Sequence, residues 1–183
     1  MGFYHLDNRF YLGGGFIHPK FLAHFKAILP NGEVTHLQQM PTAKTDFAMT
    51  HWRQKNNLFT LGGRNRSRLK QVQEYSLSKN KWKFHWELLE AISGSSAVIL
   101  NNVMYNIGGD KSSHPVMWCQ LSATYPSKWK FMNISHYSLN GYYWREVLVV
   151  ENKIVYFGAS CKNATFVLEQ EEGGEQLNGV RVD

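Results

Sequence analysis

One short segment carries side chains that could bind an anion. GGRNRSRLK, at 62–70, places basic residues at alternating positions: Arg64, Arg66, Arg68 and Lys70. In an extended segment every second side chain projects to the same side, so these four would form one basic comb. The planar guanidinium of arginine can hold a carboxylate or a phosphate through two hydrogen bonds. The segment is therefore either a solvated loop, which is the simpler alternative, or an anion-binding edge.

The other residue types that commonly do chemistry form no motif. None of the eight histidines stands in an HxH, HExxH or Cys–His spacing that could hold a metal ion. Cys119 has no histidine signature beside it, and the glycines at 13–15 lack the downstream pattern of a phosphate-binding loop. We therefore expect no catalytic residue, no metal site and no cofactor.

Composition and charge favour a globular protein with an acidic partner. The chain has 183 residues, of which 43% are hydrophobic, and its formal net charge is +6. A positive field attracts acidic protein segments, nucleic acids and anionic surfaces alike. No apolar run approaches the roughly 20 residues of a membrane span, and MGFYHLDNRF lacks the pattern of a signal peptide. Two cysteines, interpreted as reduced thiols, complete the expectation of an intracellular, cytoplasmic protein that binds no membrane.

A repeated pattern organises the chain. KWKF occurs at 81–84 and again at 128–131, and a glycine pair precedes each copy. Two landmarks that recur together at about 40 to 50 residues are typical of propellers and solenoids. Weaker glycine anchors mark a unit before and a unit after these two. The residues expected to anchor the repeat are Gly13, Gly14, Gly62, Gly63, Tyr75, Trp82, Gly108, Gly109, Trp129 and Gly158.

The residues before each glycine anchor alternate as in a packed β-strand. Phe10 and Leu12 in one unit, and Phe59 and Leu61 in the next, are apolar with one residue between them. Asparagine-rich turns precede these strands, and asparagine tolerates the positive φ angles of tight hairpins. With KWKF as the outer strand, each unit holds about four antiparallel strands. The first unit begins directly at its second strand, so we expect its innermost strand to be missing.

The pattern resembles the kelch repeat, whose units form the blades of a β-propeller. A hairpin, a Gly-Gly pair, and Tyr75 and Trp82 seven residues apart (82 − 75) carry this resemblance. It implies an all-β, kelch-type β-propeller or propeller segment, with about four blades of four-stranded antiparallel sheet and an incomplete first blade. It divides residues 1–170 into units of approximately 1–39, 40–86, 87–133 and 134–170. The tail, 171–183, is expected either to be disordered or to close a blade.

The kelch resemblance also implies a binding face. In kelch adaptors, the loop after the glycine pair receives partner peptides, and an arginine directly after the pair can hold acidic residues. Arg64 and Asn65 occupy those positions here, whereas Arg66, Arg68 and Lys70 are added on their charge alone. The expected function is a non-catalytic protein–protein interaction scaffold whose partner carries an acidic segment.

Two other classes of function stay open. The resemblance raises propeller enzymes of the galactose-oxidase type, although no motif here matches their copper ligands. A basic nucleic-acid-binding protein would use the same loop together with an exposed tryptophan of KWKF, which could stack on a base. We rank this class below protein binding, because both tryptophans fit the packing of blades better.

The number of units allows three arrangements: a fragment of a longer propeller, an open arc completed by a partner, or a small closed ring. Kelch propellers commonly have about six blades, and propellers in general have about four to eight. An open arc exposes strand edges and apolar blade faces, and so invites self-association or completion by another chain.

Overall fold

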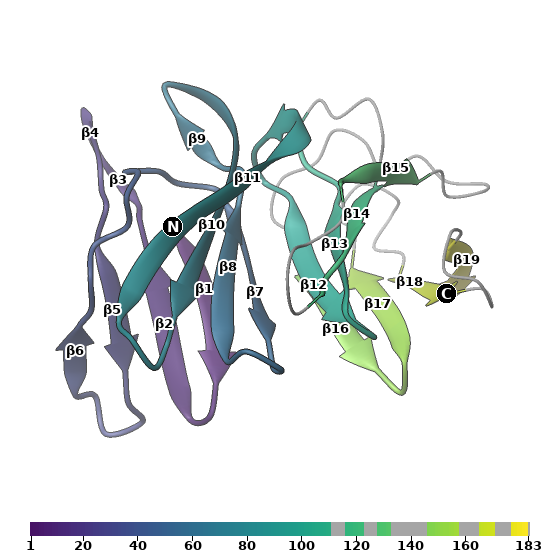
Figure 1. The fold of residues 1–183 in the computed structure, drawn as a ribbon, viewed down its shortest axis with the longest axis horizontal. Helices are drawn as coiled ribbons and strands as arrows, with labels where there is room; N and C mark the ends of the chain where they lie inside the picture. Colours follow the sequence, from purple (N-terminus) through teal and green to yellow (C-terminus); the bar gives the residue numbers. More distant parts are fainter. Residues whose placement is uncertain (111–115, 123–127, 133–145, 158–164, 171–176, 183) are drawn as a thin grey trace.

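The chain folds into four antiparallel β-sheets that follow one another along the sequence (Figure 1). The computed structural model describes residues 1–110, 116–122, 128–132, 146–157, 165–170 and 177–182. All regular structure within these residues is β-strand. The expected all-β fold with four antiparallel blades is therefore confirmed, and the sheets are arranged as a four-bladed β-propeller.

Each sheet is built from consecutive strands, ordered from the inner strand outward. The first sheet consists of β1 (Gly2–Leu6), β2 (Arg9–Gly13), β5 (Phe25–Ile28) and β6 (Val34–His36). The second consists of β7 (Ala48–Trp52), β8 (Asn57–Leu61), β10 (Ser67–Ser76) and β11 (Lys81–Ile92). The third consists of β12 (Ser96–Leu100), β13 (Val103–Ile107), β14 (Val116–Gln120) and β15 (Lys130–Met132). The fourth consists of β16 (Glu146–Val150), β17 (Lys153–Phe157), β18 (Thr165–Gln170) and β19 (Leu177–Val182).

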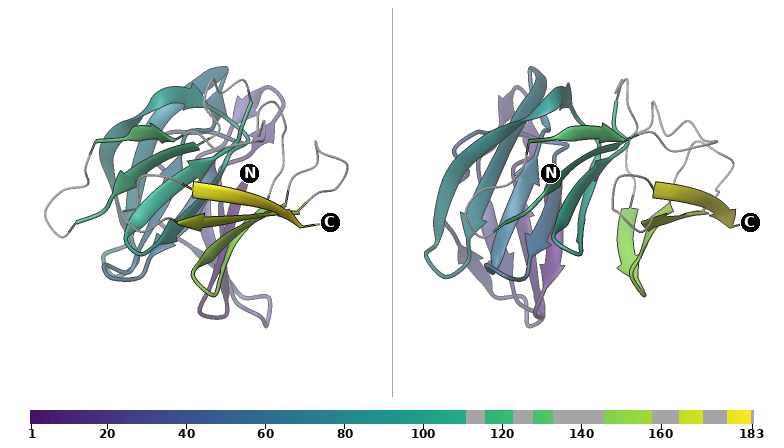
Figure 2. Two further views of the ribbon diagram at one scale, coloured as in Figure 1. Left: turned by 90° about the vertical axis from the view of Figure 1, so that its right-hand side faces the viewer. Right: turned by 45° about the vertical axis from the view of Figure 1, so that its right-hand side comes forward.

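Two small hairpins project beyond the sheets at one end of the strands. β3 (Phe16–Ile17) pairs with β4 (Lys20–Phe21), and β9 (Arg64–Asn65) pairs with the beginning of β10. Figure 1 shows both at the top of the molecule, above the first and second sheets. Turned views show the fourth sheet at the opposite end of the row of sheets from the first (Figure 2). Among the described residues, no helix is long and apolar enough to cross a membrane.

The turns between inner and second strands use a left-handed backbone. Values of φ are +48° and +57° at Asp7 and Asn8, +49° and +60° at Asn101 and Asn102, and +49° and +62° at Glu151 and Asn152. Two successive positive φ angles make the tight hairpin turn whose twist matches its strands. Asparagine tolerates this region because its short side chain can hydrogen-bond locally. The expected asparagine-rich hairpin turns are confirmed at these positions.

Glycine pairs end the second strands, where the chain leaves the sheet. The φ angles are +60° and +97° at Gly62 and Gly63, and +68° and +107° at Gly108 and Gly109. In the first sheet the matching angles, +61° and +128°, belong to Gly14 and Gly15. The anchor expected at Gly13 and Gly14 therefore lies one residue later, because a run of three glycines contains two pairs and only the backbone angles distinguish them. Gly158 lies outside the described residues.

This shift changes which side chains of β2 face the core. Tyr11 is only 6% exposed, whereas Phe10 is 46% exposed and Leu12 is half-buried. The expected alternation in β2 thus has the correct period of two. However, Tyr11 faces the second sheet, whereas Phe10 and Leu12 lie on the opposite face.

The first sheet contains its innermost strand, which corrects the expectation of an incomplete first blade. β1 pairs with β2 from Gly2 opposite Gly13 to Leu6 opposite Arg9. A five-residue strand in which only Tyr4 and Leu6 pack against a core gives too short an alternation to recognise in the sequence. In the C-terminal segment, β19 pairs with β18 as the outer strand of the fourth sheet, so it does not supply the first sheet.

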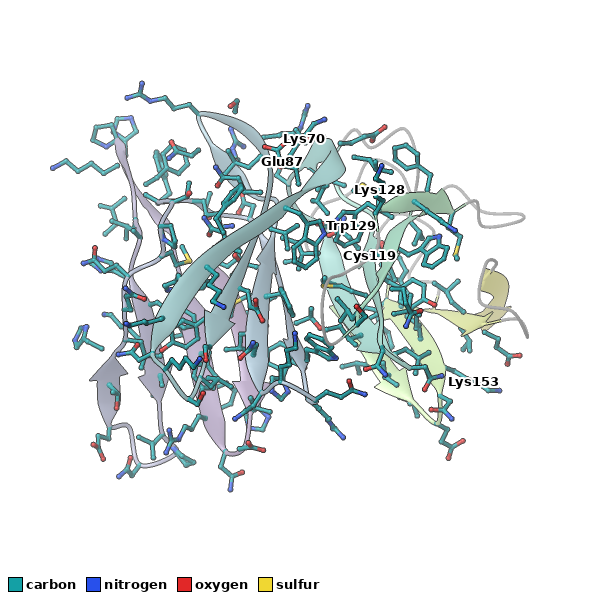
Figure 3. All side chains as sticks on the ribbon, in the orientation of Figure 1. Lys70, Glu87, Cys119, Lys128, Trp129 and Lys153 are labelled. Atoms are coloured by element: carbon teal, nitrogen blue, oxygen red, sulfur yellow. The ribbon has the colours of Figure 1, made fainter. Side chains whose placement is uncertain are left out.

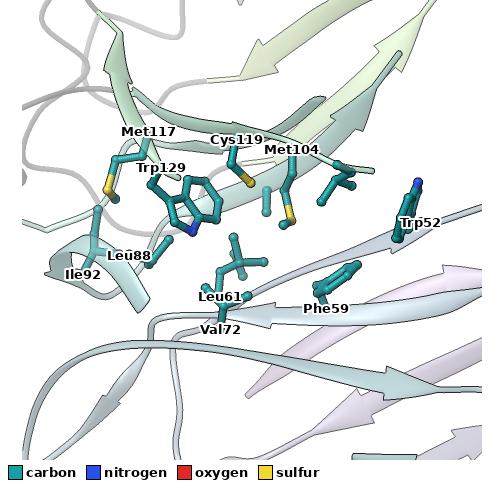
Figure 4. Close-up of a cluster of buried hydrophobic side chains, with 13 residues drawn as sticks. Trp52, Phe59, Leu61, Val72, Leu88, Ile92, Met104, Met117, Cys119 and Trp129 are labelled. Carbon is teal, nitrogen blue, oxygen red and sulfur yellow. The ribbon is translucent and has the colours of Figure 1, made fainter. Parts of the chain in front are cut away.

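Three buried clusters lie between consecutive sheets. The first–second cluster includes Tyr11, Phe25, Leu58 and Tyr75; the second–third cluster includes Phe59, Leu61, Met104, Cys119 and Trp129 (Figure 4); the third–fourth cluster includes Val98, Tyr105, Ile107, Ile154 and Tyr156. The two KWKF tryptophans each face the preceding sheet. The ring of Trp82 lies 5.0 Å from that of Phe25, and Trp129 is 5% exposed. Each tryptophan therefore helps to seal its own sheet against the one before.

Candidate functional site

The basic segment forms a hairpin and not an extended edge. β9 folds back on β10, so that Asn65 lies opposite Ser67 and Arg64 opposite Arg68. Arg66 stands at the tip with a φ of +61°. The expected comb of four parallel basic side chains is therefore wrong. The left-handed backbone at the tip reverses the chain, and alternation of side chains holds only along an extended strand.

Of the five expected site residues, Asn65, Arg68 and Lys70 bind groups of the protein itself. Arg68 donates two hydrogen bonds to Oδ2 of Asp110, from Nε at 3.2 Å and from Nη2 at 2.9 Å. Lys70 donates from Nζ to the carbonyl oxygen of Leu89 at 2.8 Å, and Figure 3 shows it at the upper end of the second sheet. These contacts attach the base of the hairpin to the third sheet and to β11.

Asn65 and the backbone of Arg64 attach the hairpin to the linker between β6 and β7. Nδ2 of Asn65 donates to the carbonyl oxygen of Ala43 at 2.7 Å. The backbone N–H of Arg64 donates to the carbonyl oxygen of Thr45 at 2.8 Å, and the N–H of Thr45 donates back to Arg64 at 3.0 Å. The main chain at Arg64 is thus fixed, while its guanidinium stays available.

Within the segment 64–70, Arg64 and Arg66 are the basic residues whose side chains stay exposed and have no polar partner among the described residues. Arg64, together with Phe16, Phe21, Thr45 and Asp46, lines a cavity of about 320 Å³. We call Arg64, Arg66 and the residues lining this cavity the basic corner. It lies between the β3–β4 hairpin and the β9 hairpin.

The basic corner combines two kinds of chemistry. The rings of Phe16 and Phe21 lie 4.8 Å apart and give the cavity an apolar wall. Asp46 carries the one negative charge of the lining, and it accepts a hydrogen bond from Oγ1 of Thr45 at 3.1 Å. An incoming carboxylate would be attracted to the two guanidinium groups and repelled by Asp46, so the corner can orient as well as attract an acidic group.

A buried lysine near this corner was not foreseen from the sequence. Lys44 has no exposed surface; its Nζ donates to Oγ1 of Thr60 at 3.0 Å and lies 5.1 Å from the centre of the Phe47 ring. Burial lowers the pKa of Lys44 from 10.5 to about 7. No sequence signal distinguishes it from a surface lysine, because burial here results from the packing of the first sheet on the second.

A larger cavity, of about 1060 Å³, lies between the inner strands of the four sheets. Its lining includes Tyr4 and His51, whose rings lie 6.4 Å apart. Burial raises the pKa of Tyr4 and lowers the pKa of His51. Within the described ranges, no three histidine, cysteine, aspartate or glutamate side chains gather as metal ligands would. Cys119 is buried, and burial raises the pKa of its thiol, which keeps the sulfur protonated.

Comparison with models of known protein families gives no match, and comparison with curated proteins gives no match either. The chain is therefore characterised by its own features: a four-bladed β-propeller whose loops present a basic corner beside the second blade.

Proposed function

We propose that the chain is a non-catalytic interaction module that binds an acidic segment of a partner protein at the basic corner. The observation that carries this proposal is the state of Arg64: its backbone N–H and carbonyl both hydrogen-bond to Thr45, the residue lines a cavity, and its exposed side chain has no polar partner among the described residues. A fixed main chain reduces the entropy lost on binding, and guanidinium–carboxylate pairs are among the stronger hydrogen bonds.

We also propose that the repeat is of the kelch type and that the protein acts inside the cell. The kelch assignment is supported by the left-handed glycine pairs and by the contact of Tyr75 with Trp82, whose ring centroids lie 4.9 Å apart. Arg64 follows one of those pairs directly. The buried, protonated thiol of Cys119 suits a reducing compartment.

A protein partner is favoured over a nucleic acid by the positions of the two KWKF tryptophans. Trp129 is buried between the second and third sheets, and Trp82 packs against Phe25 and Tyr75. Base stacking requires a free aromatic face, which these contacts occupy in part or in full. The exposed positive charge at Arg64 and Arg66 then favours carboxylates displayed on a protein.

The test is a pull-down at physiological salt, with bound proteins identified by mass spectrometry. The wild-type chain is compared with an Arg64→Ala/Arg66→Ala variant, in which Arg68 is left intact because it holds Asp110. A Lys79→Ala/Lys81→Ala variant is the matched control, since it removes the same charge from exposed residues at the opposite end of β10.

We expect a discrete partner that the control retains and the arginine variant loses. A synthetic peptide of its acidic segment should bind the arginine variant at least about tenfold more weakly, because hydrogen bonds to charged groups contribute roughly 1.5–3 kcal/mol each. Equal loss in both variants would indicate general attraction by net charge and would contradict the proposal. Retention of the partner by both variants would contradict the basic corner as its site.

A further inference from the structure

The first and fourth sheets each leave one apolar face without a covering sheet. Figure 1 shows these sheets at the left and right ends of the molecule. The apolar residues of the first end face are Phe3, Phe10, Leu12 and Ile28, beside His5 and Lys26; those of the fourth end face are Leu148, Val150, Val155, Phe157 and Val167, beside the ion pair of Lys153 with Glu169. Among the described residues, no buried cluster joins the first sheet to the fourth.

The apolar side chains of these faces are widely exposed. Exposure is 56% at Phe3 and 46% at Phe10 on the first end face, and 50% at Leu148, 49% at Val150 and 42% at Phe157 on the fourth. Single exposed apolar residues are ordinary, but several on one sheet face form a contiguous patch, which is a mark of an interaction surface.

The fourth end face matches a face that is already packed in this protein. Val98 lies opposite Tyr105 in the third sheet, and the same place in the fourth sheet is held by Leu148 opposite Val155. Val98 and Tyr105 are 8% and 0% exposed, within the third–fourth cluster. The outer face of the fourth sheet thus carries apolar residues at the same places as the face of the third sheet that packs onto the fourth.

The first end face matches the other half of the same contact. Counted from the hairpin turns, Phe10 and Leu12 of β2 correspond to Ile154 and Tyr156 of β17. Ile154 and Tyr156 are both 0% exposed, and they belong to the third–fourth cluster that also contains Val98. The two end faces therefore correspond to the two halves of the contact that joins the third sheet to the fourth.

We infer that a second copy of this chain covers both end faces. The first sheet of each copy packs on the fourth sheet of the other, so a two-fold axis generates two identical contacts and leaves no end face uncovered. The result is a ring of eight blades, twice the four of one chain, which is within the usual range of about four to eight blades. The inner strands of all four sheets line one cavity, so the row of sheets curves around it, and a second copy that curves the same way can meet both end faces.

The area involved is compatible with a stable dimer. Each half-exposed phenylalanine offers on the order of 100 Å² for burial, since a whole aromatic side chain buries about 150–250 Å². With the aliphatic side chains of both end faces, the two contacts together would bury on the order of 1,000 Å² of apolar surface. Polar atoms at the rims add to this, and stable interfaces bury about 1,200–2,000 Å² in total.

The first experiment is sedimentation velocity of the full chain over a wide range of concentrations. We expect a single species of twice 21.2 kDa, and we expect Phe10→Glu and Leu148→Lys each to convert it to a monomer. Phe84→Lys is the matched control, because Phe84 is 55% exposed on the outer strand of the second sheet, away from both end faces. Circular dichroism of all three variants verifies that they fold.

A mixing experiment distinguishes the closed ring from other dimers. When the Phe10→Glu chain meets the Leu148→Lys chain, one contact pairs the two introduced opposite charges and the other contact is unaltered. The mixture should therefore form a heterodimer although neither variant self-associates. A monomeric wild-type chain at all concentrations would overturn the inference. So would open-ended polymers, a dimer insensitive to both end-face variants, or a mixture that stays monomeric.

Discussion

Arg68 of β10 and Asp110, which follows the glycine pair of the third sheet, join the second and third blades. Nη2 of Arg68 lies 2.9 Å from Oδ2 of Asp110, and the two side chains are 34% and 16% exposed. Asp110 occupies the place after its glycine pair that Arg64 occupies in the second blade. Equivalent positions thus carry opposite charges: the aspartate joins two blades, whereas the arginine is exposed.

Breaking this ion pair should lower stability modestly. We expect Arg68→Ala and Asp110→Ala each to reduce the free energy of unfolding by about 1 kcal/mol, because the pair is partly shielded but not buried. Urea unfolding at low and high salt measures the effect, which should shrink as salt rises. In the double variant the losses should be less than additive, and strict additivity would show that the two side chains are not coupled.

Replacing a glycine of the pair at 62–63 should be unfavourable for two reasons, the positive φ angle and the lack of space for a Cβ atom. Comparison with Gly32 separates these two costs. A Cβ at Gly62, where φ is +60°, would lie 2.5 Å from the carbonyl oxygen of Ile92. A Cβ at Gly32, where φ is +84°, would meet nothing within 4 Å. We expect Gly32→Ala to cost about 1–2 kcal/mol from strain alone, and Gly62→Ala to cost clearly more because backbone must move. Equal losses in chemical denaturation would contradict the close approach.

The period of the repeat was predictable because each of its signals is local. Hairpin turns need positive φ, which favours Asn101 and Asn102, and packed strands alternate, as at Phe59 and Leu61. The register of the first blade was not predictable in the same way. Three successive glycines allow two anchors, and a shift of one residue exchanges the two faces of β2.

The candidate site was predictable only in composition. The sequence places Arg64 and Arg66 in a loop, but it does not reveal that Asp110 engages Arg68 or that Phe16 and Phe21 line a neighbouring cavity. Those contacts join segments far apart in the chain, and no local pattern encodes them.

The tryptophans of the two KWKF segments should differ in their contribution to stability. Trp129 is 5% exposed and lies 6.4 Å from Trp86, whereas Trp82 is half-buried. We expect Trp129→Ala to lower the free energy of unfolding by about 3–5 kcal/mol, the usual range for a buried tryptophan. Trp82→Ala should cost less because part of its ring already contacts water. Urea denaturation of the two variants measures the difference, and a larger loss at Trp82 would contradict the burial of Trp129.

Lys44 should make stability depend on pH in a direction opposite to that of a salt-bridged lysine. Its pKa falls from 10.5 when the side chain is free to about 7 in the folded chain, because burial opposes the charged form. Below about pH 7 both states are protonated, and the folded state bears the whole cost of the buried charge. Between about pH 7 and pH 10.5 the unfolded state binds more protons, so the free energy of unfolding rises with pH by up to about 4–5 kcal/mol.

The Lys44→Met variant isolates this effect, because methionine keeps an unbranched apolar stem and removes the amine. We expect the stability of the wild type relative to the variant to increase steadily from about pH 6 to about pH 9, as measured by urea unfolding. Staying below pH 9 avoids Tyr105, whose pKa is raised by burial to about 12 and whose ionisation would act in the opposite direction. The variant loses the hydrogen bond to Thr60 at every pH. This loss lowers its free energy of unfolding by a constant amount and leaves the slope of that free energy against pH unchanged. Parallel curves for the two proteins would therefore show that Lys44 titrates alike in the folded and unfolded states.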